Sequence, residues 1–221
     1  EDLVDAGANL LFLAPRHPAA VAPVVSSLRA KGVKIVLLTR KLNSEDYDTF
    51  VSPDDYQIAR KAAKFLAGHL GGKGRVLMLE GVVTASTAIK RKAGFLDGMK
   101  GHAGIEVISK VGDYSRAGAI KAVDRALDEG LKFDAIYAHN DAMAAGARIA
   151  LSNAGIDPAD VPTVGIDYLP EAREAIRKGE QLASFTYPIC DKAGVAAALG
   201  LLNGKAVPRF IEVASQIVTR A

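Results

Sequence analysis

The 221-residue chain carries 28 Lys and Arg against 25 Asp and Glu, so its formal net charge is only +3. With 49% hydrophobic and 24% charged residues, the composition is that of a soluble globular protein and excludes a disordered or collagen-like chain. The basic residues are scattered among acidic ones, which does not favour nucleic acid as a partner, and no apolar stretch approaches the roughly 20 residues of a membrane span.

Short apolar runs alternate with amphipathic segments along almost the whole chain. We expect strands at 10–13, 34–38, 50–51, 76–79, 107–109, 135–138, 163–166, 182–185 and 211–213. Most of these runs are continuously apolar, as expected for strands of a parallel sheet that is covered on both faces. Between them lie stripes with helical spacing, such as Val21, Val25 and Leu28. The pattern predicts an α/β fold built of doubly wound parallel sheets.

Capping residues and prolines indicate where elements begin and end. Residues 1–7 are typical of the last two turns of a helix that ends on Gly7, and such a short helix is not stable alone. We therefore expect the chain to begin inside a fold. Ser115 and Asp141 are predicted helix N-caps. A lobe boundary is expected near Pro53, with a return crossing at Pro188.

Polar residues follow several predicted strands, where an open α/β sheet binds its ligand. These residues are Pro15-Arg16, Thr39-Arg40, Asp113-Tyr114, His139-Asn140-Asp141 and Asp167-Tyr168. Arg, Asn and Asp side chains together match the mixed donors and acceptors of a polyol, and aromatic rings suit its apolar face. Taken singly, each has a structural alternative: Ser115 and Asp141 as caps, Asp167 as a turn residue, and the arginines as surface residues.

Motifs of enzymes and metal sites are missing from the sequence. Gly71-Gly72-Lys73-Gly74 precedes a predicted strand and lacks the order of a phosphate-binding loop, so we interpret it as a turn. The four histidines do not have zinc-site spacing, and no calcium-binding loop occurs. Cys190 is predicted to be a small buried hydrophobic residue. We therefore expect no catalytic residues, no metal and no cofactor.

Three segments resemble those of type I periplasmic sugar-binding proteins of ABC transporters, the ribose-binding group. They are the run from Tyr137 to Ala147, the run Val164-Gly165-Ile166-Asp167, and Lys90-Arg91-Lys92-Ala93-Gly94-Phe95. Leu38-Thr39-Arg40 and Leu182-Ala183-Ser184 fall in the matching order, and the similarity spans the whole chain. The resemblance implies two doubly wound lobes joined by hinge strands, with the ligand held between them.

The resemblance also implies lobe boundaries and site residues. Residues 1–53 with 189–214 form the first lobe, which lacks an N-terminal β-α-β portion of the family, and residues 54–188 with 215–221 form the second. The residues that match family ligand positions are Arg40 in the first lobe and Arg91, Tyr114, Asn140 and Asp167 in the second. Thr39 departs from the pattern, because the sugar binders usually have an Asp before the Arg.

The resemblance implies an extracytoplasmic solute-binding protein that captures a small neutral sugar or polyol by hinge closure. It would deliver the ligand to an ABC transporter permease and act as a monomer in the periplasm, with no enzymatic activity and no nucleic acid partner. Two alternatives remain open: the effector-sensing core of a LacI-type transcription regulator, and the sensor domain of a receptor kinase. Asn140 favours transport over the regulator, which usually has Ser at this position.

Overall fold

The computed structural model describes residues 1–220, which form two compact units. The first unit comprises Glu1–Asp54, Ala85–Thr87 and Pro188–Ala214. The second comprises Asp55–Thr84, Ala88–Tyr187 and the chain from Ser215 onward. The sequence analysis predicts crossings between the two lobes after residues 53, 188 and 214. The assignment of Ala85–Thr87 to the first unit had no counterpart in the sequence analysis.

The first unit contains a four-stranded parallel sheet with the order β1-β2-β3-β9. Its elements are α1 (Asp2–Asp5), β1 (Leu10–Leu13), α2 (Pro18–Ala30), β2 (Lys34–Leu38), β3 (Thr49–Ser52), α8 (Asp191–Leu202) and β9 (Phe210–Glu212). Helix α2 begins with Pro18 in its first turn, where the missing N–H costs nothing, and Gly32 follows its end with φ of 87°.

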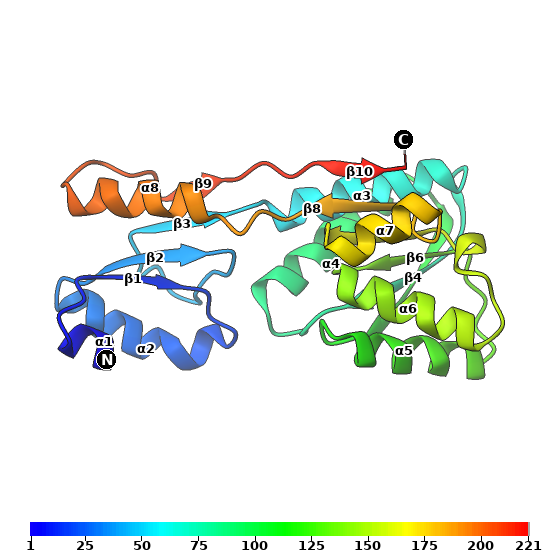
Figure 1. Cartoon of the computed structure of the whole chain (residues 1–221), viewed down its shortest axis with the longest axis horizontal. Coiled ribbons are helices and arrows are strands. Elements are labelled where there is room, and N and C mark those ends of the chain that lie inside the picture. The colour runs from blue at the N-terminus through cyan, green and yellow to red at the C-terminus, as the bar shows by residue number, and fades with distance from the viewer. Residues whose placement is uncertain (221) are drawn as a thin grey trace. The chain divides into compact units, whose positions relative to one another are not determined.

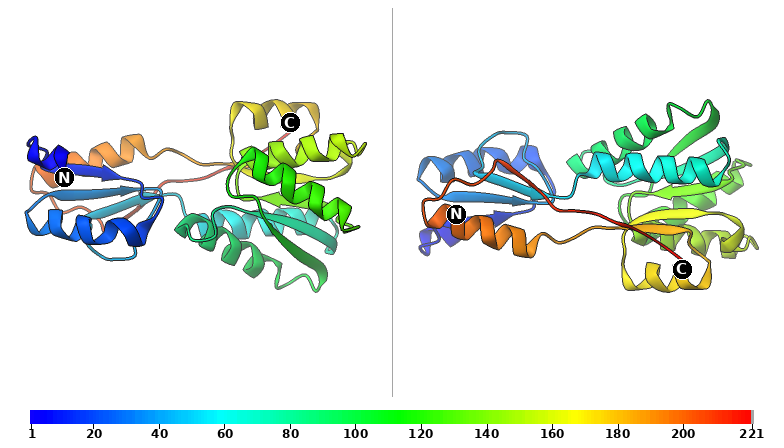
Figure 2. Two further views of the ribbon diagram at one scale, coloured as in Figure 1. Left: turned by 90° about the horizontal axis from the view of Figure 1, so that it is seen from below. Right: turned by 90° about the horizontal axis from the view of Figure 1, so that it is seen from above.

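Helices cover both faces of this sheet because its central strand is apolar on both sides. Ile35 and Leu37 of β2 pack against the α2 residues Val25 and Leu28. Val36, which points to the other face, belongs to the cluster that includes Ala197 and Ala198 of α8. Figure 2 shows α2 and α8 on opposite faces of the sheet. Burial on both faces explains why the sequence of β2 does not alternate.

The second unit contains a six-stranded sheet with the order β10-β8-β7-β6-β4-β5 (Figure 1). All pairs are parallel except β10 with β8. Its strands are β4 (Lys73–Glu80), β5 (Gly104–Val111), β6 (Ala135–Ala138), β7 (Thr163–Asp167), β8 (Ala183–Thr186) and β10 (Ile217–Thr219). Its helices are α3 (Asp55–His69), α4 (Ser86–Met99), α5 (Arg116–Asp128), α6 (Asp141–Asn153) and α7 (Pro170–Lys178), with a 3-10 turn at Pro158–Asp160.

Two apolar clusters lie on the two faces of this sheet. One joins α3 and α4 to Val76, Met78 and Tyr137, and the other joins α5 and α6 to Leu77 and Ile136. Neighbouring residues of β4 and β6 thus enter opposite clusters, as the twofold periodicity of a strand requires. The sheet is therefore a buried layer whose strand ends, rather than its faces, are free to carry polar side chains.

The predicted fold class is confirmed: the chain is an α/β protein with two largely parallel, helix-covered sheets. The sequence analysis missed β10, a three-residue antiparallel edge strand at Ile217–Thr219. Of the turn predicted at residues 71–74, Gly71 and Gly72 lie in a turn and have positive φ, whereas Lys73 and Gly74 already belong to β4. Within residues 1–220, none of the helices has both the length and the apolar character needed to cross a membrane.

Candidate functional site

Five parallel strands of the second unit end at the same edge of the sheet, because parallel neighbours share one direction. The residues at or just beyond these ends are Glu80 and Gly81 after β4, Asp113 and Tyr114 after β5, His139 and Asn140 after β6, Asp167 and Tyr168 at β7, and Tyr187 after β8. The sheet topology thus gathers polar and aromatic residues that lie up to about a hundred positions apart.

The backbone at this edge is strained. Asp113 and Tyr114 both have φ of 55°, Asp167 has φ of 115° and Tyr168 has φ of 57°. Positive φ is costly for residues with a side chain, by about 1–3 kcal/mol each, and persists where the surrounding structure imposes it. Such residues cluster at binding and catalytic sites. Their concentration at one sheet edge therefore marks this edge as a candidate site.

Arg91 of α4 lies at the centre of the site and is only 3% exposed. Its Nε donates to Oδ1 of Asp55 at 2.7 Å, and its Nη1 donates to the carbonyl oxygen of His139. The guanidinium carbon lies 4.7 Å from the ring centroid of Tyr187 and 6.0 Å from that of Tyr114. These contacts orient the guanidinium before any ligand arrives.

Asp55, the first residue of α3, is the buried counter-charge of Arg91. Its second carboxylate oxygen accepts a hydrogen bond from the Tyr187 hydroxyl at 3.2 Å. Burial raises the pKa of Asp55, whereas Arg91 and Tyr187 act in the opposite direction. The sequence analysis did not identify Asp55 or Tyr187 as site residues. The pairing depends on contacts between elements far apart in the chain, for which the sequence carries no local signal.

Asn140 and Tyr114 are joined by a hydrogen bond. The Asn140 side-chain amide donates to the Tyr114 carbonyl oxygen at 3.4 Å, and its oxygen accepts from the Met143 amide at 3.0 Å. Asn140 is thus the N-cap of α6, and the prediction that Asp141 caps this helix is wrong. Asp141 instead turns its carboxylate toward β7 and β8. The prediction for Ser115 is confirmed, since its hydroxyl accepts from the Gly118 amide at 2.9 Å.

Tyr114 lies tightly over the end of β4. A Cβ placed on Gly81 would stand only 2.1 Å from the Tyr114 ring, so only glycine leaves room for it. Packing against Gly81 therefore holds the Tyr114 ring in place at the sheet edge, beside Arg91.

Asp167 is a half-buried carboxylic acid at the end of β7. Burial raises its pKa to about 7, Arg91 acts against this shift, and Asp141 and Asp55 reinforce it. The influence of Arg91 on Asp167 places the two side chains in one electrostatic environment. The structure thus brings together four of the five predicted site residues, namely Arg91, Tyr114, Asn140 and Asp167, all in the second unit.

Two buried polar atoms beneath the site have no hydrogen-bond partner among residues 1–220. They are the Tyr137 hydroxyl and Nε2 of His139. Nδ1 of His139 accepts from the Gly81 amide at 3.2 Å, so in the neutral ring the proton resides on Nε2. Burial lowers the pKa of His139 to about 3, with Arg91 and Lys92 acting in the same direction, so the ring stays neutral at physiological pH.

We expect the Tyr137→Phe variant to be at least as stable as the wild type. An unpaired buried hydroxyl costs about 1–3 kcal/mol, and phenylalanine keeps the ring that stacks on Phe95 at 4.0 Å between centroids. Urea unfolding of the two proteins checks this. A loss of more than about 1 kcal/mol in the variant would contradict it and show that the hydroxyl is hydrogen-bonded in solution.

Arg40, the fifth predicted residue, belongs to the first unit and is half-buried. It follows β2 in a tight turn in which Thr39 has φ of 59° and the Arg40 amide donates to the Leu38 carbonyl at 2.6 Å. No hydrogen bond or ion pair engages its guanidinium within the described part of the chain. The N–H groups of the Arg40 guanidinium thus remain available to a ligand. Like the site residues of the second unit, Arg40 lies at a strand end where the backbone is strained.

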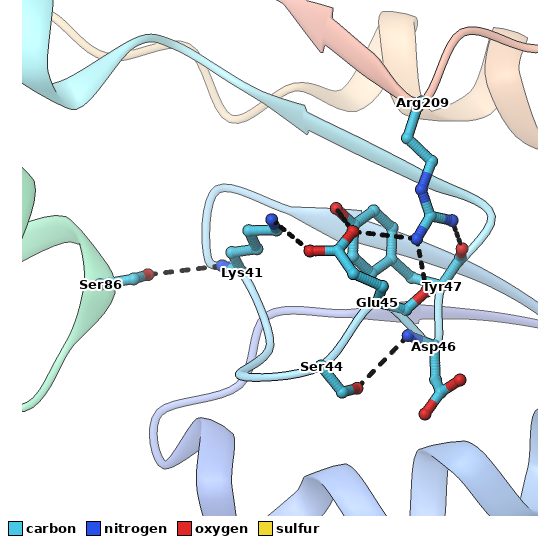
Figure 3. A network of polar contacts seen from close by, with 7 residues as sticks. All are labelled: Lys41, Ser44, Glu45, Asp46, Tyr47, Ser86 and Arg209. Atoms are coloured by element: carbon cyan, nitrogen blue, oxygen red, sulfur yellow. Dashed lines mark hydrogen bonds and ion pairs between the residues drawn. The ribbon is translucent and has the colours of Figure 1, made fainter.

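The loop that follows Arg40 is held by a polar network centred on Glu45 (Figure 3). Glu45 pairs with Lys41 at 2.8 Å and with Arg209 at 3.1 Å, and it accepts a hydrogen bond from the Tyr47 hydroxyl at 2.9 Å. Arg209 also donates to the carbonyl oxygens of Glu45 and Tyr47 and lies over the Tyr47 ring at 3.9 Å. Hydrogen bonds from Lys41, Tyr47 and Arg209 lower the pKa of Glu45 to about 2.

We expect the Arg209→Met substitution to lower the free energy of unfolding by about 1 kcal/mol, because the Tyr47 carbonyl loses the Arg209 donor and the Glu45 carbonyl keeps only the Tyr47 amide. The matched control is Arg29→Met in the same unit, whose guanidinium pairs with Asp48 only at 3.6 Å and is 37% exposed. This control is expected to change little. Thermal unfolding of both variants provides the measurement, and equal effects would show that the network contributes nothing specific.

Comparisons with known proteins agree on one family. The family profile described as "Periplasmic binding protein domain" matches residues 1–206. The ribose import binding protein RbsB of Bacillus subtilis is 29% identical over 225 residues, which cover 100% of this chain and 72% of the relative. The xylitol-binding protein of Mycolicibacterium smegmatis is 28% identical over 213 residues, which cover 94% of this chain and 60% of the relative.

A solved structure shows the same similarity at the level of the fold. The fructose-binding periplasmic domain of a hybrid two-component system matches with a TM-score of 0.94 and 30% sequence identity. The match covers 99% of this chain and 74% of that one. The chain therefore spans only part of each of these relatives, and less than two thirds of the xylitol-binding protein.

Proposed function

Because this chain belongs to the periplasmic binding protein domain family, we propose that it is the ligand-binding part of an extracytoplasmic solute-binding protein. Its ligand in this proposal is a small neutral sugar or polyol, which is handed unchanged to the permease of an ABC transporter. The names of the relatives, which bind ribose and xylitol, support this class of ligand.

The observation that carries the proposal is the cluster of Arg91, Tyr114, Asn140 and Asp167 at one sheet edge. Arg91 uses two of its five N–H groups on Asp55 and His139, so further donors remain for ligand hydroxyls. Asp167 supplies an acceptor, and Tyr114 supplies an aromatic face for the apolar side of a sugar ring. Such a set combines the donors, acceptors and apolar contact that a polyol requires.

Capture proceeds in this proposal by hinge closure. Arg40 of the first unit and the cluster of the second unit contact the same ligand, so that the ligand favours the closed state of a pre-existing equilibrium. The permease then recognises the closed form. The protein acts as a monomer in the periplasm, without nucleic acid and without catalysis.

Isothermal titration calorimetry of the full-length protein against pentoses, hexoses and polyols tests the ligand class. We expect one member of the panel to bind with a stoichiometry of one and to be recovered unchanged after incubation. Binding of an amino acid or a nucleobase, with no heat from any sugar or polyol, would overturn the proposal. Chemical turnover of the sugar would overturn the claim that no reaction occurs.

A sensory role is the second candidate function. It is favoured by the match to the fructose-binding periplasmic domain of a hybrid two-component system. Disrupting the gene and measuring uptake of the radiolabelled ligand distinguishes the two roles. Lost uptake supports transport, whereas normal uptake with lost ligand-dependent transcription supports sensing.

A further inference from the structure

A chain of buried polar side chains lies behind the strained turn at the end of β7. The Tyr168 amide donates to the Ser184 hydroxyl at 3.0 Å, and this hydroxyl donates to Oδ2 of Asp141 at 2.7 Å. The Leu169 amide donates to the same carboxylate oxygen at 3.2 Å. Asp141 thus holds both residues that follow Asp167, directly or through Ser184.

The second oxygen of Asp141 continues the chain to α6. Oδ1 accepts a hydrogen bond from Nε2 of Gln181 at 2.9 Å, and Oε1 of Gln181 accepts one from Nη1 of Arg148. All three side chains are buried, with exposed fractions of 2% for Asp141, 2% for Gln181 and 7% for Arg148. We name the series Arg148–Gln181–Asp141–Ser184 the relay.

The chemistry of these side chains fixes the order of hydrogen-bond donors and acceptors along the relay. The amide of Gln181 has one donor end and one acceptor end, so its donor must face the carboxylate and its acceptor the guanidinium. Neither Asp141 nor Arg148 forms an ion pair within 4.0 Å among residues 1–220, so Gln181 is the group that connects the two charges. Burial raises the pKa of Asp141, and the hydrogen bonds of Ser184, Gln181 and the Leu169 and Tyr168 amides oppose this shift.

Strand β7 leaves space for the relay at Gly165. A Cβ at this position would stand 2.0 Å from Oδ1 of Asp141 and 3.2 Å from Nε2 of Gln181. The relay and the strand backbone are therefore in direct contact, and a side chain at position 165 would collide with the Asp141 carboxylate.

We propose that Arg148 and Gln181 are positioning residues for the ligand site, an inference that rests on the proposed function. Arg148 does not touch the strand-end cluster. It orients Gln181, and Gln181 holds the Asp141 carboxylate toward the turn after β7. This turn sets the backbone that carries Asp167. The far end of the relay lines a groove of about 610 Å³ between α6 and α7, together with Lys178 and Glu174.

The test compares Arg148→Met with Lys178→Met, which removes a cation from the same groove without touching the relay. In ligand-free protein, hydrogen exchange at the Tyr168 and Leu169 amides is expected to accelerate in Arg148→Met and to stay unchanged in Lys178→Met. For the sugar that calorimetry identifies, we expect Kd to rise about tenfold in Arg148→Met only, the effect of one lost hydrogen bond to a charged group. Arg148→Lys, which keeps a donor, should recover part of both effects.

Unchanged exchange at Tyr168 and Leu169 in Arg148→Met would overturn the proposal, even if the variant unfolds at a lower temperature. Because exchange is measured without ligand, this outcome is independent of whether the protein binds sugars. If Arg148→Met does not fold, Gln181→Glu serves instead, since it places a second carboxylate beside Asp141 while keeping an acceptor for Arg148. This variant should loosen the same two amides, and protected amides would likewise contradict the relay.

Discussion

Replacing Arg91 with methionine is expected to lower the free energy of unfolding by about 3–5 kcal/mol, the usual cost of leaving a buried charge without its partner. Asp55 is 2% exposed and would keep only the Tyr187 hydroxyl as a hydrogen-bond donor among the contacts described. Methionine has a similar length and fills much of the space, so the loss arises from the charge rather than from a cavity. Urea unfolding of the wild type and the variant gives the value.

The double variant Arg91→Met/Asp55→Asn separates this explanation from a general packing defect. Removing the stranded carboxylate should restore a large part of the lost stability, because the buried charge is then gone. In the single variant, stability should also fall as pH rises, since the pKa of Asp55 is raised further without Arg91 and ionisation becomes more costly. A loss below about 1 kcal/mol, or a double variant no more stable than the single one, would contradict the ion-pair account.

The second large effect is a dependence of ligand affinity on pH near neutrality. Asp167 has a pKa of about 7 in the folded protein, against an ordinary value of 3.8. Ligand hydroxyls donate to the carboxylate, so binding favours its ionised form and lowers the pKa. Affinity should therefore increase as pH rises through 7, and below 7 the Kd should rise by at most tenfold per pH unit.

Calorimetry between pH 5 and 8 measures this dependence, and Asp167→Asn is the control that should flatten it. His139 does not interfere, because its pKa of about 3 lies outside the range. Without ligand, the free energy of unfolding depends on pH in the opposite direction to the affinity. The folded protein holds the Asp167 proton more tightly than the unfolded chain, so stability should fall as pH rises from about 4 to about 7. A Kd that is constant across the range in the wild type would refute the role of Asp167.

Much of the fold followed from the order of apolar runs and helical stripes. Buried parallel strands such as β2 and β6 are short and continuously apolar, and glycines such as Gly32 and Gly130 follow helix ends with positive φ, so both leave a local signal. The edge strand β10 is only three residues long and pairs antiparallel with β8, which local patterns do not reveal.

The candidate site was predictable only in part. Predicted strand ends pointed to Tyr114, Asn140 and Asp167, the family resemblance added Arg91 of α4, and the structure places all four at one sheet edge. The cap of α6 was assigned to Asp141 instead of Asn140, because both residue types are good caps and only the backbone decides which one stands at the helix start. Contacts between elements far apart in the chain define the roles of Asp55, Gln181 and Arg148, so no spacing pattern in the sequence predicts these roles.

The central claim is that residues far apart in the chain bind one ligand together. A crystal structure of the full-length protein with the sugar or polyol that calorimetry selects tests it most directly. We predict that Arg40, Arg91, Asn140 and Asp167 each place a polar atom within about 3.2 Å of a ligand oxygen, with Tyr114 against the ring. A ligand bound elsewhere, with these side chains facing separate surfaces, would contradict the account.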